Sequence, residues 1–270
     1  TLYCYDLRLG KFRDYTNRND CERQYFNRYQ ASNGMWLFDA KNGVRHIIYN
    51  NGEFSIHDYT TANRQLPSQE KLNVDEDAHH NIWISTARGV VRIAPNGKRT
   101  AIATGKHVKT TTTGTDYFAI LTEEDDAYLY RTDGRLARKS HLPSMTGFAG
   151  KSRSSMIWNG GWYIFTEQET FRMDLRTGVF SHSEIQIPYA MEKNSIPGYK
   201  CLNDKQGNLY LFGPKGWKKQ LHLLDNKNYI NGRDRIFTVE RDHRGRFFIA
   251  SYGGGLFVYD PHDDQLQQFS

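Results

Sequence analysis

Acidic residues cluster at several points of the chain, and paired carboxylates can hydrolyse a glycosidic bond. That reaction needs two carboxyl groups about 5–9.5 Å apart across a sugar, one of them acting as a general acid. The densest groups are Asp75–Asp77 and Glu123–Asp126, and Glu167 and Glu169 follow further on. Residues 123–126 fall in an expected loop between strands, where a solvated charge cluster is the simpler interpretation. The carboxylates therefore do not by themselves indicate a hydrolase.

The histidines and cysteines do not have the spacing of a metal or redox site. His79 and His80 are the one adjacent pair among 10 histidines, and no His-x-x-x-His or His–Cys spacing surrounds them. Cys4, Cys21 and Cys201 form an odd set without C-x-x-C spacing, which disfavours a disulfide framework. Cys201 lies in an apolar strand pattern, so we expect a buried free thiol there. We expect no catalytic residues, no metal and no cofactor.

Three aspartates have instead the sequence context of turns. Asp77, Asp204 and Asp242 each come shortly before an apolar run, and two of the turns end in a glycine, Gly207 and Gly245. An Asp side chain in this position accepts hydrogen bonds from the backbone two residues further on. We expect each of these turns to join the first strand of a repeat to its second.

The runs that follow such turns recur along the whole chain. Each contains one aromatic residue, and the successive separations are 47, 35, 45, 47 and 38 residues by subtraction of sequence numbers. A recurrence of about 40–50 residues indicates a repeat architecture. Each repeat reads as four short strands, which is one blade of a β-propeller. The anchor aromatics, expected on second strands and packed between sheets, are Trp36, Trp83, Phe118, Tyr163, Tyr210 and Phe248.

We therefore predict an all-β fold, a β-propeller of four-stranded antiparallel blades that forms a single domain over residues 1–270. About six and a half blades are expected here and seven in the parent protein, within the usual range of four to eight. Because Thr1 falls inside a third-strand pattern, we interpret the chain as a fragment of a larger protein. The expected half blade is 1–16, and the blades are about 25–60, 72–104, 107–143, 150–188, 198–231 and 236–270.

The charge and the hydropathy pattern disfavour two classes of partner. The net charge is +6, and the Lys and Arg residues are spread through every repeat instead of forming the concentrated stripe typical of nucleic-acid binding. No apolar run approaches the ~18 residues that span a membrane. We expect no nucleic-acid partner and no membrane segment in this fragment.

The best-formed repeats resemble a known family of sequence repeats. The segments 77–86, 204–211 and 242–256 share a leading Asp and an apolar run with a central aromatic; the last two also have a turn Gly, and the last has a Gly pair followed by Leu. Tyr259-Asp260 and Tyr5-Asp6 supply a characteristic ending. This pattern resembles the two-component-regulator propeller repeat. The likeness is degenerate in the repeats around Trp36, Phe118 and Tyr163, where the leading Asp is missing.

The resemblance implies a function in signalling. Such repeats build the periplasmic sensor region of hybrid two-component regulators typical of gut Bacteroidetes, which recognise breakdown products of complex glycans. It implies a ligand-sensing ectodomain, without enzymatic activity of its own, in a parent protein tethered to the inner membrane that carries a histidine kinase. The implied partners are an oligosaccharide, a second propeller, a β-sandwich domain and a second copy of the parent chain. A propeller-fold glycan lyase or hydrolase and a protein-interaction scaffold stay open as alternatives.

Binding residues are expected at the mouth of a central channel, on innermost strands and on the loops between second and third strands. Arg and Lys bind carboxylate or sulfate groups, and aromatic rings stack on sugar faces. We therefore expect an acidic oligosaccharide, sulfated or uronic; the alternative is that the polar groups of the channel bind only water. Trp158 is a second candidate for an exposed aromatic platform. The predicted ligand-binding set is Arg88, Arg153, Lys200, Lys215, Trp217 and Tyr252.

Overall fold

The structure, a computed structural model, describes residues 3–6, 10–14, 27–50, 53–102, 105–143, 154–192, 196, 198–223, 236–252 and 254–269. The chain divides into two compact units, which are described separately. Unit 1 comprises residues 1–76 and 80–108, and unit 2 comprises residues 77–79 and 109–270.

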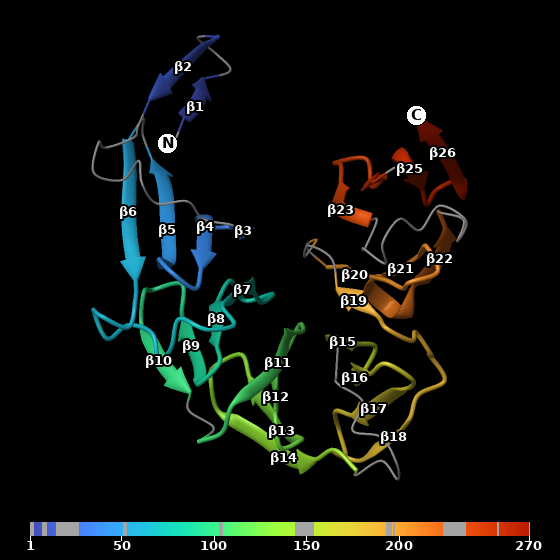
Figure 1. The fold of residues 1–270 in the computed structure, drawn as a ribbon, viewed down its shortest axis with the longest axis horizontal. Coiled ribbons are helices and arrows are strands. Elements are labelled where there is room, and N and C mark those ends of the chain that lie inside the picture. The colour runs from blue at the N-terminus through green and yellow to red at the C-terminus, as the bar shows by residue number, and fades with distance from the viewer. Residues whose placement is uncertain are drawn as a thin grey trace. The chain divides into compact units, whose positions relative to one another are not determined.

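Unit 1 contains two four-stranded antiparallel sheets and one two-stranded sheet, drawn from blue to green in Figure 1. Within each sheet the strands follow one another in chain order, as in a meander. The two-stranded sheet pairs β1 (Tyr3–Asp6) with β2 (Lys11–Asp14). The first four-stranded sheet is β3 (Asn27–Ala31), β4 (Gly34–Asp39), β5 (Gly43–Asn50) and β6 (Glu53–Tyr59). The second is β7 (Asn73–Glu76), β8 (Ile82–Thr86), β9 (Gly89–Ile93) and β10 (Arg99–Ile102).

The core of unit 1 lies between these two four-stranded sheets. Trp36 and Phe38 alternate along β4 and belong to one core cluster with Ile82 and Ile84 of β8, as expected for a strand whose alternate residues face the core. The Trp36 ring stacks on the imidazole of His46 with centroids 3.9 Å apart. Burial lowers the pKa of His46, which favours the neutral ring.

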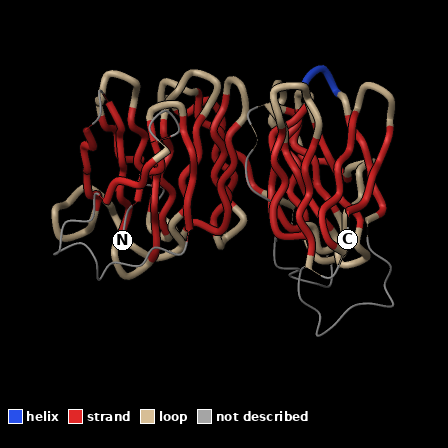
Figure 2. The backbone as a smooth tube through the Cα atoms, turned by 90° about the horizontal axis from the view of Figure 1, so that it is seen from above, coloured by secondary structure: helices blue, strands red, loops and turns tan. Residues whose placement is uncertain are grey.

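Unit 2 contains four more four-stranded sheets in the same meander order. Among the described residues the one helix is η1 (Pro214–Gly216), a single 3₁₀ turn, shown in blue in Figure 2. The first two sheets are β11 (Val108–Thr113), β12 (Tyr117–Thr122), β13 (Asp126–Arg131), β14 (Leu136–His141), and β15 (Ser154–Trp158), β16 (Gly161–Phe165), β17 (Thr170–Asp174), β18 (Phe180–His182). The last two are β19 (Met191–Glu192), β20 (Lys200–Asn203), β21 (Asn208–Phe212), β22 (Lys218–His222), and β23 (Ile236–Arg241), β24 (Phe247–Ser251), β25 (Gly255–Asp260), β26 (Gln265–Phe269).

Six four-stranded antiparallel sheets with almost no helix confirm the predicted fold class, a β-propeller. The anchor aromatics of five sheets lie on the second strand, as expected. Trp36, Trp83, Phe118 and Tyr163 are buried. Phe248 is half-buried, because its neighbours Phe247 and Ile249 face the core shared with the preceding sheet.

The fifth sheet departs from the sequence expectation. A two-residue strand, β19, precedes the expected first strand and lies beside β15, the first strand of the sheet before it. Lys200 and Cys201 are therefore on the second strand, and Tyr210 is on the third. The placement of Lys200 on an innermost strand and of Tyr210 on a second strand was wrong. Met191 and Glu192 form too short a strand to leave a periodic signal in the sequence.

Candidate functional site

The predicted ligand-binding residues lie in different parts of the chain. Arg88 belongs to unit 1, where it is exposed in the turn between β8 and β9 and donates its backbone N–H to Thr86 Oγ1 at 3.2 Å. Arg153 lies outside the described residues. The other four residues belong to unit 2. Three of them, Lys200, Lys215 and Trp217, belong to the fifth sheet and its loop, and Tyr252 belongs to the sheet that follows.

Lys200, Lys215 and Trp217 lie at one end of the fifth sheet. Lys200 pairs across the sheet with Phe212, and Phe212 with Lys218, so this row of residues borders the loop that holds η1. Lys215 is exposed within η1, in a left-handed conformation with φ 55°. Because this loop follows the third strand, the expected placement of Lys215 and Trp217 between second and third strands was also wrong.

Tyr252 is distant from this group, although it lies in the neighbouring sheet. The Trp217 ring stacks on Phe247 at the start of β24, with centroids 6.3 Å apart. Tyr252 follows the last residue of β24, five residues beyond Phe247, which corresponds to roughly 17 Å of extended strand. Its side chain is 61% exposed and contacts the edge of Phe237. Tyr252 and Trp217 are therefore too far apart to stack on one sugar ring.

Aromatic packing defines the end of unit 2 that holds Trp217. Tyr199, directly before β20, meets Trp217 edge-on at 5.9 Å and Phe247 edge-on at 5.2 Å between ring centroids. Phe247 is fully buried, whereas Tyr199 and Trp217 are half-buried. Trp217 is thus partly packed into the core, and only the remainder of its ring faces solvent. The role of Tyr199 was missed because nothing in the local pattern places it beside residue 217.

Trp158, the second expected platform, is also partly packed. Its indole N–H donates to the carbonyl of Gly213 at 2.7 Å, and its ring contacts the edge of Phe212 at 5.2 Å between centroids. The indole thereby joins the fourth and fifth four-stranded sheets, β15–β18 and β19–β22, at the loop that also carries Lys215. This contact fixes the position of that loop in unit 2.

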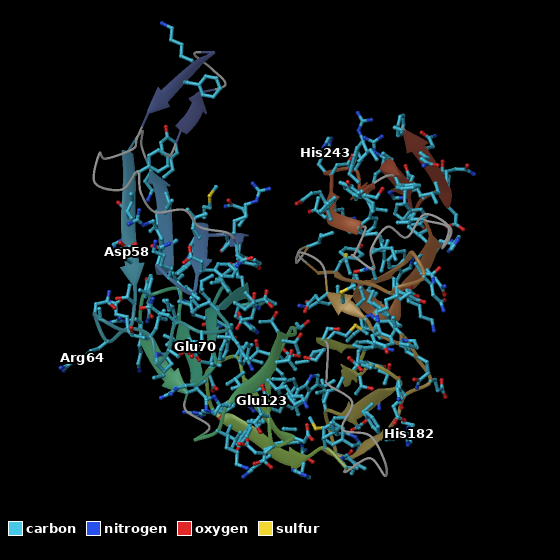
Figure 3. All side chains as sticks on the ribbon, viewed as in Figure 1. Asp58, Arg64, Glu70, Glu123, His182 and His243 are labelled. Atoms are coloured by element: carbon cyan, nitrogen blue, oxygen red, sulfur yellow. The ribbon has the colours of Figure 1, made fainter. Side chains whose placement is uncertain are left out.

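The acidic residues singled out in the sequence lie in turns or near the ends of strands. Asp77, Asp204 and Asp242 accept backbone N–H groups two residues further on, at 2.9, 2.8 and 3.0 Å, which confirms the predicted turn chemistry. Asp126 faces the imidazole of His141 at 3.0 Å. Glu123, labelled in Figure 3, is exposed in the turn between β12 and β13.

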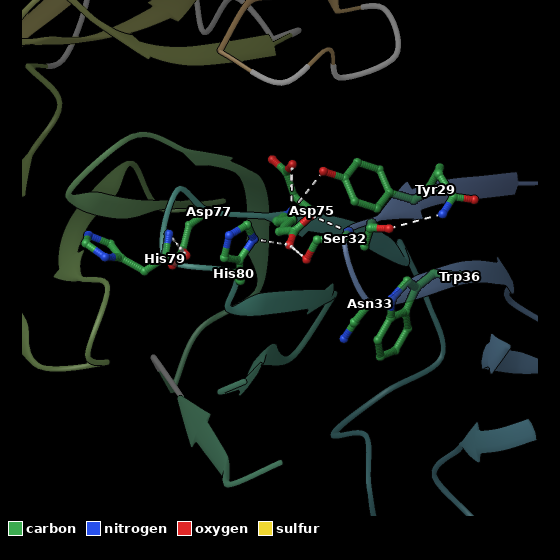
Figure 4. A network of polar contacts seen from close by, with 11 residues as sticks. Tyr29, Ser32, Asn33, Trp36, Asp75, Asp77, His79 and His80 are labelled. Atoms are coloured by element: carbon green, nitrogen blue, oxygen red, sulfur yellow. Dashed lines mark hydrogen bonds and ion pairs between the residues drawn. The ribbon is translucent and has the colours of Figure 1, made fainter. Parts of the chain in front are cut away.

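A polar network in unit 1 gathers residue types that hydrolases use. Ser32 donates its hydroxyl to Glu76 Oε1 and its backbone N–H to Glu76 Oε2, the latter at 2.8 Å, while His80 Nδ1 lies 2.9 Å from Oε1 (Figure 4). The serine and the histidine each contact the carboxylate, so the network lacks the serine–histidine hydrogen bond of a nucleophilic triad. The Glu76 N–H donates to the hydroxyl of Tyr29 at 3.2 Å. Burial, followed by the charge of Asp75, raises the pKa of Tyr29.

Buried polar groups elsewhere have a structural role. Arg45 is buried, and its Nε and Nη2 donate to Asp58 at 2.7 and 2.8 Å, a bidentate pair that joins β5 to β6 (Asp58 is labelled in Figure 3). Cys201 is a free thiol that is 1% exposed, and burial raises its pKa to about 12, which confirms the expected buried thiol. Within the described ranges, no three His, Cys, Asp or Glu side chains gather as a metal site, and no helix is long and apolar enough to cross a membrane.

Comparisons with known proteins identify the fold. No family model and no curated protein matches the chain. Among solved structures, a streptogramin B lyase is similar with a TM-score of 0.60 and 12% identity, over 91% of this chain and 82% of that one. The extracellular domain of BT4673 from B. thetaiotaomicron, a putative hybrid two-component system, is similar with a TM-score of 0.60 and 12% identity, over 93% of this chain and 37% of that one. BBS1N, crystallised in complex with ARL6DN, has a TM-score of 0.53 and 10% identity, over 87% of this chain and 76% of that one.

At these identities the similarity establishes the fold alone. The chain spans little more than a third of the BT4673 extracellular domain and most of the streptogramin B lyase. The three proteins differ in function, and a propeller fold by itself does not choose between them.

Proposed function

We propose that this chain is a ligand-sensing propeller from the ectodomain of a hybrid two-component regulator. Two independent observations support the proposal. The segments 77–86, 204–211 and 242–256 resemble the two-component-regulator propeller repeat, and the fold matches an extracellular domain of a putative hybrid two-component system over 93% of the chain. The repeat carries the proposal, because the fold likeness extends equally to a lyase.

The remaining features of the parent protein belong to the same proposal. The parent is periplasmic, is tethered to the inner membrane, and carries a second propeller, a β-sandwich domain and a histidine kinase. It acts as a homodimer, responds to an oligosaccharide derived from a complex glycan, and controls polysaccharide-utilisation genes. The ligand acts by binding one arrangement of the ectodomain more tightly than another, since only a difference in affinity shifts an equilibrium.

A thermal-shift panel of oligosaccharides tests this function. A ligand that binds only the folded state raises the melting temperature, by an amount that grows with its concentration relative to Kd. We expect one class of oligosaccharide to shift the melting temperature of the chain while leaving the glycan itself intact. No shift with any glycan, on this chain or on the whole ectodomain, would overturn the proposal.

An enzyme is the second candidate function, supported by the fold likeness to streptogramin B lyase. Product analysis separates it from the sensor. Release of cleavage products from any glycan in the panel would establish the enzyme, whereas a melting shift without products supports the sensor. Retention of a protein partner without any glycan response would instead favour an interaction scaffold.

A further inference from the structure

The guanidinium of Arg241 lies over two aromatic rings at the end of unit 2 that holds Trp217. Its Cζ atom is 4.8 Å from the ring centroid of Tyr199 and 5.9 Å from that of Phe247. Both distances are within the ≈ 6 Å range of a cation–π contact. The two rings are inclined at 78° to each other, so the guanidinium can lie flat on at most one of them, and such a contact leaves its edge N–H donors available to a bidentate acceptor. The contact therefore orients Arg241 without using its hydrogen-bonding capacity.

The rings beneath Arg241 are held in place by the core and by the adjoining loop. Phe247 is fully buried between β19–β22 and β23–β26. The Trp217 N–H donates to Pro214 O at 3.1 Å, and its carbonyl accepts the Gly213 N–H at 2.8 Å, which closes the loop on itself. A Cβ at Gly213 would lie 2.6 Å from Tyr199 Cε1 and 2.9 Å from Trp217 Cε3, so the glycine lets both rings pack on its backbone.

Arg241 differs from the neighbouring cations in its charge partners. Lys200 Nζ lies 3.2 Å from Glu192, Lys219 Nζ 2.7 Å from Asp264, and Arg246 Nη2 2.8 Å from Asp242. The structure gives Arg241 no carboxylate partner within the described ranges, and its side chain is exposed. The exposed Lys215, in η1, and Lys218, the first residue of β22, add positive charge on either side of Trp217. An oriented, unneutralised guanidinium beside half-buried aromatic rings is suited to an anion carried on a flat apolar surface.

We propose that Arg241, Tyr199 and Trp217 form a binding site for a carboxylate or sulfate group carried on a sugar ring. Arg241 binds the anionic group through two parallel N–H donors, and the solvent-facing parts of Tyr199 and Trp217 contact the ring. Lys215 contributes charge from the edge of the site. The sugar in this assignment rests on the proposed function, whereas the anion site rests on the geometry of unit 2. Arg88 and Tyr252 have no part in it.

Paired ligands that differ only in the anionic group test the site. The chain is titrated calorimetrically with cellobiouronic acid against cellobiose, and with 6-sulfated against unsulfated N-acetyllactosamine. Inorganic sulfate is included alone to measure the contribution of the anion. We expect at least one acidic member to bind about tenfold or more tightly than its neutral counterpart. Its affinity should fall as salt rises, because exposed charge pairs are screened over about 8–10 Å near physiological ionic strength.

Variants assign the binding to particular side chains. Arg241→Gln should weaken binding of the acidic ligand about tenfold or more and leave the affinity for the neutral ligand unchanged. Arg241→Lys should retain part of the preference for the acidic ligand, because it keeps the positive charge but lacks the paired N–H donors of the guanidinium. Trp217→Phe should weaken both ligands and remove a ligand-dependent change in tryptophan fluorescence. Arg135→Gln is the matched control, because Arg135 is an exposed arginine in the turn before β14, with a side chain 87% exposed. It should bind as the unmodified chain does.

The outcomes separate this site from the proposed function. If an oligosaccharide binds and Arg241→Gln, folded as judged by circular dichroism, binds it equally well, the site is wrong and the sensor proposal stands. If no acidic member of the panel binds while a neutral glycan does, the site is also wrong. If no glycan of any kind binds the chain or the ectodomain, the sensor proposal fails; binding of inorganic sulfate that is lost in Arg241→Gln would then still support the anion site.

Discussion

Two hairpin turns of unit 2 have nearly the same local chemistry but occupy different places in their sheets. In Asp204–Gly207 and in Asp242–Gly245, the aspartate carboxylate accepts the N–H groups two and four residues further on. Each turn ends in a glycine of positive φ, 83° at Gly207 and 91° at Gly245, a conformation that suits glycine best. The first turn joins the second and third strands of its sheet, and the second joins the first and second.

The difference shows that a turn motif specifies a hairpin but not the place of that hairpin in a sheet. Asp204 brings β20 and β21 together through hydrogen bonds with Gln206, Asn208 and Tyr210, all within the same hairpin. Whether another strand pairs with β20 depends on β19, which lies between β20 and β15 of the preceding sheet. This one added strand moves Lys215 and Trp217 to the end of unit 2 where Arg241 lies.

The two aspartates also differ in burial. Asp204 is 5% exposed, and its carboxylate accepts four hydrogen bonds, from Gln206 N, Asn208 N, Asn208 Nδ2 and Tyr210 Oη. Asp242 is half-exposed and bonds the backbone of Arg244 and Arg246 together with the Arg246 guanidinium. At Asp204 protein donors take the place of water around the carboxylate. Removing the Asp204 carboxylate should therefore lower the free energy of unfolding more than removing that of Asp242.

The largest expected effect is at the core that both sheets share. Phe247→Ala should lower the free energy of unfolding by about 3–5 kcal/mol, because it removes a fully buried ring and leaves a cavity. The adjacent Phe248→Ala should cost clearly less, since Phe248 is half-buried on the other face of the same strand. Urea denaturation of both variants measures the difference. Equal losses would show that both faces of β24 are equally packed.

The next effect distinguishes the two turns directly. Asp204→Ala should cost about 1–3 kcal/mol of unfolding free energy, because it leaves the buried N–H of Asn208 without an acceptor. Asp242→Ala should lower the free energy of unfolding by less, because water can reach the N–H groups of Arg244 and Arg246 once the carboxylate is removed. Denaturation midpoints of the two variants give the comparison. A larger loss at Asp242 would contradict the burial argument.

A smaller effect tests the hydroxyl that supports the deeper turn. Tyr210 Oη donates to Asp204 at 3.0 Å, and burial, followed by the Asp204 charge, raises the pKa of Tyr210. Tyr210→Phe should therefore lower the free energy of unfolding by about 0.5–1.5 kcal/mol. In the double variant with Asp204→Ala this cost should disappear, because the acceptor is already gone. Additive losses in the thermodynamic cycle would show that the two groups act independently.

The smallest effect is a pH dependence at the exposed turn. Although partial desolvation opposes it, the N–H groups of Arg246 and its guanidinium hold the pKa of Asp242 below its usual value of 3.8. Between that value and the lower folded pKa, the unfolded chain binds more protons than the folded chain, so stability falls as pH falls. The stability that Asp242 contributes is thus present above 3.8 and lost below it. The melting-temperature gap between the unmodified chain and Asp242→Asn should narrow with acidification; a gap independent of pH would contradict this assignment.

Much of the fold follows from the sequence because it depends on short-range interactions. Trp36, Trp83 and Phe118 recur at blade spacing, and alternation with polar neighbours turns each toward a core. The Asp–Gly turns follow from backbone geometry within four residues. Cys201 was expected to be buried from its apolar strand pattern alone, although it lies on the second strand of its sheet and not the first.

The candidate site depends on contacts that no local pattern encodes. Arg241 lies over Tyr199, 42 residues earlier in the chain by subtraction, because two sheets pack face to face. Trp217 meets the same cluster only because β19 shifts its sheet by one strand. The sequence determined the hairpins, the alternation of buried and exposed residues along strands, and the buried positions, because these depend on neighbours in the chain. The tertiary structure decided which hairpins lie side by side, because that choice depends on packing energies summed over residues far apart in sequence.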